Sequence, residues 1–416
     1  MKLNRVILSS SIGNALEWYE YLLYAHFADV ISRVFFPSEN TYTSLMMTFA
    51  VFAVGFLARP IGGMVFGYIG DEYGRKASLT ISIAMIAIPT TVIGLLPSYN
   101  TIGFLAPTLL IIMRMLQGMS LGGEFSASAI FLVESAPENK KGLFGSFSTS
   151  SIAMGILFSS FVIFLIKHFL TQEQVYSYGW RIPFLFSFVI GFIGLYIRKK
   201  LPESHTFIEE KKRHHLSKTP FKDIIRYHIS TLIACCAVFM TVTIPFYTIN
   251  VFSKTVMTVM LGYTNTIVTA VHVTITIVFM ISAILFGYIS DKLNGKKILL
   301  ISAMLMAVFI YPFIWSLSSK DITLVFMMSV IAGILIGSFQ GVFPTLIVQS
   351  FPVNVRSCGV GLSYSIPAAL FGGTAPMILT FLVKNCNSIF GIVYYVLFGC
   401  ICTIAGLMYL IYKKKA

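Results

Sequence analysis

Long apolar segments dominate this sequence and restrict the folds open to it. A helix needs about 20 mostly apolar residues to cross the hydrocarbon core of a bilayer. Only 11% of the 416 residues are charged, whereas a soluble globular chain carries about 25%. The sequence therefore predicts an all-α membrane protein with twelve transmembrane helices. We place these spans at residues 6–30, 43–69, 77–96, 103–133, 143–166, 180–197, 229–253, 264–289, 298–317, 322–349, 358–383 and 389–412.

The longest interval without an apolar run, residues 198–228, divides the spans into two groups of six. Two landmarks recur in both groups at nearly the same offset. "GYIGDEYGRK" follows the second span and "GYISDKLNGKK" the eighth, while "PENKKG" follows the fourth and "PVNVRS" the tenth. A duplicated six-helix unit explains both pairs. We therefore predict an N-terminal bundle at 1–197, a cytoplasmic central loop at 198–228 and a C-terminal bundle at 229–416, with a binding site between the bundles.

Lysine and arginine fix the expected orientation. With the N-terminus inside, 22 of the 30 basic residues fall on the cytoplasmic side. They include Arg198 in the central loop and Lys413, Lys414 and Lys415 at the C-terminal end. The positive-inside rule then places both termini in the cytoplasm. The net charge of +14 does not indicate nucleic-acid binding, because the basic residues lie between apolar runs and not on one soluble face.

Four charged residues interrupt the apolar runs at one depth. At about 1.5 Å per helical residue, Glu17, Glu20, Arg59 and Arg114 all lie near the middle of the membrane. One isolated charge there costs at least ~2.5–3.5 kcal/mol. We expect the two acids and two arginines to pair with one another and to line a cavity. The alternative is an internal ion-pair network that only locks the first, second and fourth helices together.

The first helix carries a polar and aromatic stripe. Asn14, Glu17, Tyr21 and Tyr24 recur at helical spacing, with Glu20 beside them. Such a face should line an internal cavity, because facing lipid would be costly. A low-dielectric site pushes a carboxylate toward its neutral form and a nearby arginine opposes this, so Glu17 and Glu20 could bind and release protons. Glu124 is either a second relay or a contact between cytoplasmic helix ends.

The predicted spans of the second half contain no acid and no arginine. We expect that half to complete the substrate pocket with polar side chains; the candidates are Tyr247, Asn250, His272, Gln340 and Tyr364. In "AALFGGTAP", residues 368–376, a glycine pair and Pro376 break the eleventh span and mark either a hinge or close packing. Asp71 and Asp291 stand at cytoplasmic helix ends, where each can pair with an arginine or cap an adjoining helix and so act as an inner latch.

Several of these stretches resemble a known family. "GYIGDEYGRK" and "RMLQGMSLGGE" are similar to signatures of the major facilitator superfamily. "GNALEWYEY", "LARPIGG", "GWRIPF", "GLSYSIPAALFGGTAP" and residues 117–146 are closer still to its metabolite–proton symporters, within them the proline/betaine transporters. The resemblance implies alternating access, uptake coupled to protons and a bacterial inner-membrane location.

The resemblance also implies roles for individual residues. It makes Glu17, Glu20, Arg114 and Glu124 candidates for proton coupling and Arg59 a candidate for substrate binding; the gate would comprise Asp71, Gly74, Arg75 and Asp291. Four features depart from the pattern: Glu72 replaces a basic residue, Glu20 replaces an aspartate, the "KLNGKK" loop has an extra residue and no arginine, and the long tail of osmosensing relatives is missing.

The predicted substrate is a small zwitterion such as proline or glycine betaine. Trp18, Tyr21 and Tyr24 offer aromatic faces to a quaternary ammonium, and Arg59 or Arg114 a partner for its carboxylate. Alternatives are a proton symporter of a dicarboxylate or other organic acid, and a transporter-like receptor that does not transport. The sequence shows no nucleophile with a base, no metal-ligand spacing and no phosphate loop, so we expect neither an enzyme nor a cofactor. Expected partners are a small-molecule substrate, protons and the lipid bilayer, with no nucleic acid and no obligate protein partner.

Overall fold

The computed structural model describes residues 3–38, 40–213 and 217–412, and these residues form helices and connecting turns without a β-strand. The terminal lysines Lys2, Lys413, Lys414 and Lys415, used for the predicted orientation, lie outside the described residues. The helices on the N-terminal side are α1 (Leu3–His26), α2 (Ala28–Phe35), α3 (Thr41–Glu72), α4 (Arg75–Leu95), α5 (Tyr99–Ile102), α6 (Leu105–Ser135), η1 (Glu138–Lys140), α7 (Lys141–Phe169), α8 (Gln172–Gln174), η2 (Val175–Gly179) and α9 (Arg181–Lys199).

The central segment forms two short helices, α10 (His205–Lys212) and α11 (Pro220–Tyr227). The remaining elements are α12 (Ile229–Tyr247), η3 (Thr248–Phe252), α13 (Ser253–Thr255), η4 (Val256–Met260), α14 (Asn265–Lys292), α15 (Gly295–Ser319), α16 (Ile322–Ser350), η5 (Val353–Val355), α17 (Arg356–Pro367), η6 (Ala368–Gly372), α18 (Ala375–Asn385) and α19 (Gly391–Tyr412). The bounds agree with the predicted spans to within a few residues at most ends.

Eleven helical segments are long and apolar enough, by length and composition, to cross a membrane. Helix α1 is not among them, because its serines, Asn14, Glu17 and Glu20 lower its mean hydropathy. The expected first span, 6–30, is divided between α1 and α2 by a break at Phe27. Helical backbone pairs its own N–H and C=O groups, which is why a chain this apolar forms helices.

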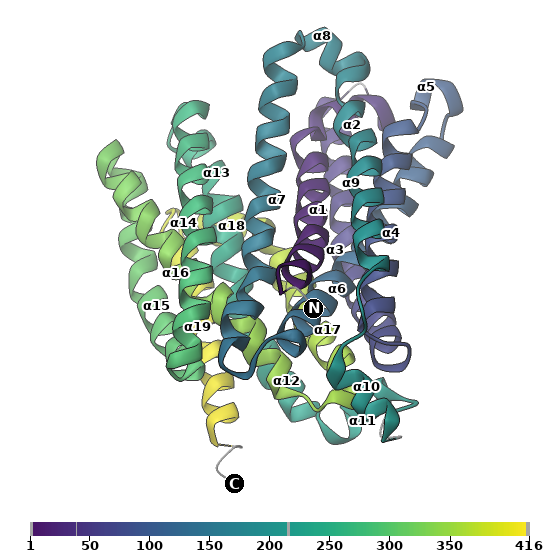
Figure 1. Cartoon of the computed structure of the whole chain (residues 1–416). Coiled ribbons are helices and arrows are strands. Elements are labelled where there is room, and N and C mark those ends of the chain that lie inside the picture. The colour runs from purple at the N-terminus through teal and green to yellow at the C-terminus, as the bar shows by residue number, and fades with distance from the viewer. Residues whose placement is uncertain (1–2, 39, 214–216, 413–416) are drawn as a thin grey trace.

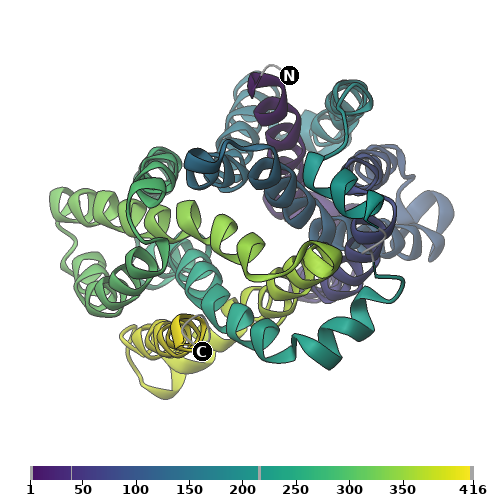
Figure 2. The ribbon, with the colours of Figure 1, turned by 60° about the horizontal axis from the view of Figure 1, so that its bottom comes forward.

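Figures 1 and 2 show α1 to α9 gathered on one side of the molecule and α12 to α19 on the other. The two groups meet where α7 packs against α14 and α3 packs against α17. Helices α10 and α11 lie at one end of the molecule, and α5 and α8 lie at the opposite end (Figure 1). The long helices therefore run between two ends that carry short helices.

Two long helices are interrupted near proline residues. The predicted break in 368–376 is confirmed: α17 ends at Pro367, a π-helical turn covers 368–372, and α18 starts at Ala375. A second break follows Pro245, where α12 gives way to the π-helical turns η3 and η4. The sequence predicted a continuous helix there. Proline lacks an N–H and disturbs the helical ladder, so both breaks have the same local cause.

Glycines bring α3 and α6 into backbone contact. A Cβ at Gly62 would lie 1.8 Å from the carbonyl oxygen of Met119, and one at Gly118 would lie 2.0 Å from that of Gly55. Only hydrogen fits at these positions, so the two axes approach closely. At this contact the Arg59 backbone of α3 lies against Gly122 of α6, and the Arg114 backbone of α6 lies against Gly55 of α3.

Candidate functional site

The four mid-membrane charges are all buried. Glu17 and Glu20 of α1 are 2% exposed, and Arg59 and Arg114 are 1% exposed. The predicted mutual pairing is wrong: among the described residues, no ion pair joins either acid to either arginine. The sequence placed these residues at one depth, but depth alone does not decide which side chains face each other.

Aromatic rings surround the two arginines instead. The Arg59 guanidinium carbon lies 4.1 Å from the ring centre of Phe56 and 5.3 Å from that of Tyr21. The Arg114 carbon lies 4.3 Å from the ring centre of Tyr24. The electron-rich face of a ring attracts a cation, more strongly where water is excluded. The aromatic stripe of α1 thus stabilises the protein's own guanidinium groups.

Glu20 and Arg114 are connected through two intermediate side chains. The Thr90 hydroxyl donates a hydrogen bond to the Glu20 carboxylate, and Gln117 Nε2 lies 2.5 Å from the same hydroxyl oxygen. Arg114 Nη1 in turn donates to Gln117 Oε1 at 2.9 Å. The acid and the arginine therefore influence each other through a polar chain that runs across α1, α4 and α6.

Glu17 has no such connection, since neither of its carboxylate oxygens has a hydrogen-bond partner. Glu17, Glu20, Tyr21, Arg114 and Gln117 line a small cavity inside the first group of helices, together with Ile86 and Leu121. The volume of this cavity is about 10 Å³, which is close to the volume that one water molecule needs. A proton carrier could enter this cavity, but an amino acid could not.

A second cavity lies between the two groups of helices, and its volume is about 30 Å³. We call it the central cavity. Three residues predicted for substrate binding line it, Trp18, Arg59 and Tyr364. Tyr247 and Gln340, second-half candidates, line it as well. Arg59 Nε and Nη2, Trp18 Nε1 and the Tyr247 hydroxyl are buried without partners. Several unpaired donors therefore gather around a cavity with largely aromatic walls.

Two predicted binding residues lie away from this central cavity. Tyr24 donates its hydroxyl to the carbonyl oxygen of Thr48 at 3.0 Å and packs against Arg114. Tyr21 lines the smaller cavity and forms an edge contact with Trp18, with ring centres 5.8 Å apart. Tyr21 consequently stands between the two cavities.

Glu124 forms a buried ion pair with Arg198 of α9, and both side chains are 0% exposed. Ser82 also donates to Glu124 at 2.5 Å, and Arg198 Nε donates to the carbonyl oxygen of Ser9 at 3.2 Å. The geometry is that of the helix contact, one of the two alternatives for Glu124. Arg198 was assigned to the central loop, but α9 continues to Lys199, so the predicted boundary was two residues early.

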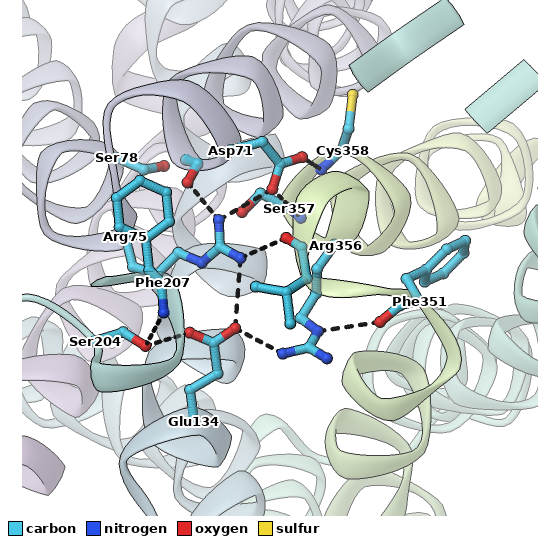
Figure 3. Close-up of polar contacts among 12 residues, drawn as sticks. Asp71, Arg75, Ser78, Glu134, Ser204, Phe207, Phe351, Arg356, Ser357 and Cys358 are labelled. Carbon is cyan, nitrogen blue, oxygen red and sulfur yellow. Dashed lines mark hydrogen bonds and ion pairs between the residues drawn. The ribbon is translucent and has the colours of Figure 1, made fainter. Parts of the chain in front are cut away.

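Asp71, near the end of α3, joins the two groups of helices (Figure 3). Helix α11 contacts α3 and α17, so this junction lies at the end that carries α10 and α11 (Figure 1). The Asp71 carboxylate accepts hydrogen bonds from the backbone N–H groups of Ser357 and Cys358, each at 2.9 Å, at the start of α17. Arg75 Nη1 donates to the same carboxylate at 3.0 Å. Asp71 thus caps a helix of the other group, where the positive end of the helix dipole favours an anion.

Glu134 extends this contact and was missed by the sequence analysis. It forms ion pairs with Arg75 at 3.4 Å and with Arg356 at 2.8 Å, and it accepts a hydrogen bond from Ser204 at 2.5 Å. Arg75 also donates to the carbonyl oxygen of Val353 at 2.9 Å. We call Asp71, Arg75, Glu134 and Arg356 the Asp71 cluster. Its partners come from α3, α4, α6 and α17.

Gly74 shows why the loop needs a glycine. Its φ is +111°, a backbone region that residues with a side chain rarely adopt. A Cβ there would also lie 2.2 Å from Glu203 Oε2. Glu203 accepts hydrogen bonds from the N–H groups of Arg75 and Lys76 at the start of α4. The central segment thereby caps α4 and holds the short turn between Asp71 and Arg75.

Asp291 makes the corresponding contact in the second group. Its two oxygens accept hydrogen bonds from the N–H groups of Gly142 and Leu143 at the start of α7, at 2.6 and 2.9 Å. No ion pair to Asp291 occurs within the described parts of the chain. Gln349 occupies the sequence position in the second half that Glu134 occupies in the first. The two contacts share a geometry but not a charge network.

The remaining candidates of the second half differ in their surroundings. His272 is held by Ser253, with Nε2 and Oγ 3.0 Å apart, and by the carbonyl oxygen of Val268 at 2.8 Å. Asn250 is 9% exposed and its Nδ2 has no partner. His272 is therefore a hydrogen-bonded residue within its own helix group, away from the walls of both cavities.

The fold and the buried site define a membrane transporter built on the major facilitator fold. A family model described as "Sugar (and other) transporter" matches residues 6–231. The chain belongs to this family of the major facilitator superfamily, whose members are transporters and not enzymes.

Curated relatives extend the similarity over almost the whole chain. A putative proline/betaine transporter of Staphylococcus aureus (strain COL) is 34% identical over 400 residues, covering 95% of this chain and 85% of the relative. The proline/betaine transporter of Salmonella typhimurium (strain LT2) is 30% identical over 405 residues, covering 95% and 81%. A glycine betaine/proline/ectoine/pipecolic acid transporter of Dickeya dadantii (strain 3937) is 29% identical over 423 residues, covering 100% and 84%.

Solved structures support the fold. A major facilitator proton:xylose symporter bound to 6-bromo-6-deoxy-D-glucose superposes with a TM-score of 0.81 at 16% identity, covering 98% of this chain and 95% of that one. An inward-open structure of the xylose transporter from E. coli gives a TM-score of 0.65 at 18% identity, covering 98% and 95%. The chain is a multi-pass membrane transporter of small molecules, and its curated relatives are bacterial.

Proposed function

We propose that the protein imports a small zwitterion of the proline and glycine betaine type together with protons. The observation that carries this proposal is the pair of neighbouring cavities around α1. The central cavity presents unpaired donors of Arg59, Trp18 and Tyr247, which suit a carboxylate and an apolar or cationic body. The smaller cavity presents the unpaired carboxyl group of Glu17. The names of the relatives support the same substrate class.

In this proposal the two cavities divide the work. Glu17 and Glu20 bind and release the proton, while Arg114 adjusts the charge of Glu20 through Gln117 and Thr90. Arg59, Trp18 and Tyr364 bind the substrate. Tyr21 lies between the cavities and contacts Trp18, so a change at Glu17 can reach the substrate site. Glu124 and Arg198 hold α6 and α9 together.

We further propose twelve membrane spans in two bundles, 1–197 and 229–416, with α1 as the twelfth span and both termini in the cytoplasm. Helix α1 has 24 residues, which is long enough to cross a bilayer. Its polar face is buried by neighbouring helices, with Asn14, Glu17 and Glu20 at most 2% exposed. The excess of basic residues in 198–228 supports the orientation.

Alternating access would depend on the Asp71 cluster and the Asp291 contact, which together form an inner latch. Both join the helix groups at the end of the molecule that we assign to the cytoplasm. With the latch formed, the two groups are held together at Asp71 and Asp291, while a cavity of about 1120 Å³ remains beside Asp291. The central cavity has room for about two water molecules, which is less than a zwitterion needs, so its walls must separate when substrate enters.

An organic acid is the second candidate, and one observation favours it. The faces of Tyr21, Tyr24 and Phe56 are already covered by arginines, which leaves Trp18 and the second-half rings for a quaternary ammonium. A non-transporting receptor is the third candidate, and it would need no titratable residue in the smaller cavity.

Uptake of labelled proline and glycine betaine into proteoliposomes, with and without an inward proton gradient, tests the proposal. We expect gradient-driven accumulation of at least one of them. Uptake of an organic acid in their place would refute the substrate class and retain the transporter. Binding without uptake of any of these compounds would support a receptor.

A further inference from the structure

Helix α11 has an apolar face that no part of the described chain covers. Pro220 and Ile224 are buried against the rest of the protein, with Ile224 at 0% exposure. On the other side Phe221 and Ile225 are 40% and 48% exposed. Tyr227, at the end of the helix, is 63% exposed. An eight-residue helix outside the membrane spans thus buries one apolar edge and leaves a second one open.

This open edge continues into the membrane. Ile229 and Ile233, at the start of α12, are 42% and 63% exposed. Residues 229–260 form one of the segments able to cross a bilayer. Only His228 separates α11 from α12, so α11 must lie where that span meets the headgroup layer. The exposed apolar residues of α12 face acyl chains, and those of α11 are at the adjoining boundary.

Basic residues flank the same edge. Lys218, Lys222 and Arg226 are exposed, and none of them pairs with a carboxylate among the residues that the structure describes. The one acid of α11, Asp223, accepts a hydrogen bond from Ser217. The Arg226 guanidinium carbon lies 5.4 Å from the ring centre of Tyr227. Helices with exposed apolar and aromatic residues beside lysine and arginine lie in the interface of anionic membranes.

We infer that α11 is an interfacial helix that binds the headgroups of anionic lipids in the adjoining leaflet. Phe221, Ile225 and Tyr227 enter the boundary between headgroups and acyl chains, and Lys218, Lys222 and Arg226 contact lipid phosphates. A neutral lipid would satisfy the apolar edge but not the three cations. The inference concerns a surface separate from both cavities and does not depend on the identity of the transported substrate.

Because of where α11 lies, lipid bound to it can stabilise the latch. Besides α12, α11 contacts α3, η5 and α17, the elements that carry Asp71, Val353 and the N–H groups of Ser357 and Cys358. A lipid that holds α11 in place therefore stabilises the side of the latch against which Pro220 and Ile224 pack. We expect anionic lipid to favour the closed inner end.

Hydrogen–deuterium exchange of the full chain in nanodiscs tests this inference. One set of discs contains phosphatidylcholine only, and the other contains one-third phosphatidylglycerol. We expect the amides of residues 218–228 to exchange more slowly with phosphatidylglycerol, by roughly fivefold or more, the effect of one basic residue at an anionic surface. The triple variant Lys218→Gln/Lys222→Gln/Arg226→Gln should lose this difference.

A matched triple variant at the end of α10, Lys211→Gln/Lys212→Gln/Arg213→Gln, removes the same charge from three exposed positions. It should keep the difference. Phe221→Ser/Ile225→Ser should weaken it while leaving all three cations. Equal exchange in the two kinds of disc for the unaltered protein would overturn the inference. Equal loss in the α10 variant would also overturn it, because net charge would then explain the effect.

Discussion

Glu124 pairs with Arg198 between α6 and α9, whereas Glu17, which lies on the adjacent α1, has no partner for either carboxylate oxygen. Gly13 makes this arrangement possible. A Cβ at Gly13 would lie 1.9 Å from both Glu124 Oε1 and Arg198 Nη2, so α1 passes directly over the ion pair. The two acids are close in space, but one is compensated by a cation and the other is not.

The first prediction concerns this ion pair. Glu124→Gln leaves Arg198 buried without a counter-charge, and breaking a buried pair in this way costs about 3–5 kcal/mol. We expect a clear fall in the thermal midpoint of the purified protein in detergent. Glu124→Leu combined with Arg198→Met should recover most of the loss, since apolar packing can replace a buried pair. Unchanged stability together with lost proton coupling would make Glu124 a relay.

The second prediction concerns Glu17. Glu17→Gln keeps the size of the side chain but cannot release a proton. Substrate accumulation should then no longer respond to an inward proton gradient, while exchange of labelled for unlabelled substrate across the membrane should persist. Both are measured in proteoliposomes. Glu173→Gln changes an exposed acid of α8 and should alter neither activity. Gradient-driven accumulation at the normal level in Glu17→Gln would remove Glu17 from the coupling site.

The third prediction concerns the latch, for which the protein contains a reporter. The side chain of Cys358 is 0% exposed, and its N–H donates to Asp71. Asp71→Asn weakens that contact and the one to Arg75, so the inner end should open more often. We expect alkylation of Cys358, followed by mass spectrometry, to accelerate about tenfold, the effect of losing one charge-assisted hydrogen bond.

Two controls accompany this measurement. Cys386 is already exposed, so its alkylation rate should be the same in both proteins. Asp291→Asn should increase Cys358 alkylation less than Asp71→Asn, because Asp291 lacks the network of Arg75, Glu134 and Arg356. An equal or larger effect of Asp291→Asn would show that the charge network adds nothing to closure.

The fourth prediction concerns the residues that line the central cavity. Trp18→Leu removes the ring of α1 that lines the central cavity and should weaken transport of glycine betaine more than that of proline, which lacks the quaternary ammonium. Arg59→Lys should raise the KM for both by roughly 10- to 100-fold, since it removes donors to the carboxylate. Arg33→Lys, at an exposed position, is the control. Unchanged betaine transport in Trp18→Leu would remove Trp18 from the substrate-binding site.

The sequence was sufficient to predict where the long helices lie, because the length of an apolar run and the pairing of helical backbone groups are local properties. The repeated loops also predicted where Asp71 and Asp291 stand. The partners of the charges were not predictable, because they depend on rotation about each helix axis and on the packing of four or five helices. Arg59 and Arg114 therefore turned out to face aromatic rings, and Glu124 turned out to face an arginine that had been assigned to a loop.

Glu134 could have been found from the sequence, since it is an acid that precedes "PENKKG" by a few residues and its counterpart in the second half is Gln349. The break after Pro245 could not be predicted from the proline alone, because Pro60, Pro89, Pro312 and Pro344 lie inside uninterrupted helices. The sequence predicted a cavity, but not its division into two, because the boundary is set by how the ring of Tyr21 packs between Trp18 and Phe52.

The contacts of Asp71 and Asp291 with helix starts affect how reversibly the inner end can open. Both aspartates hold backbone N–H groups, which water can take over as soon as the helices separate, and the carboxylates themselves hydrate well. A contact between interlocking apolar side chains would instead expose apolar surface to water each time the helices separated. At these two points the separated groups are readily hydrated, so the polar contacts can break and reform without a large energetic penalty.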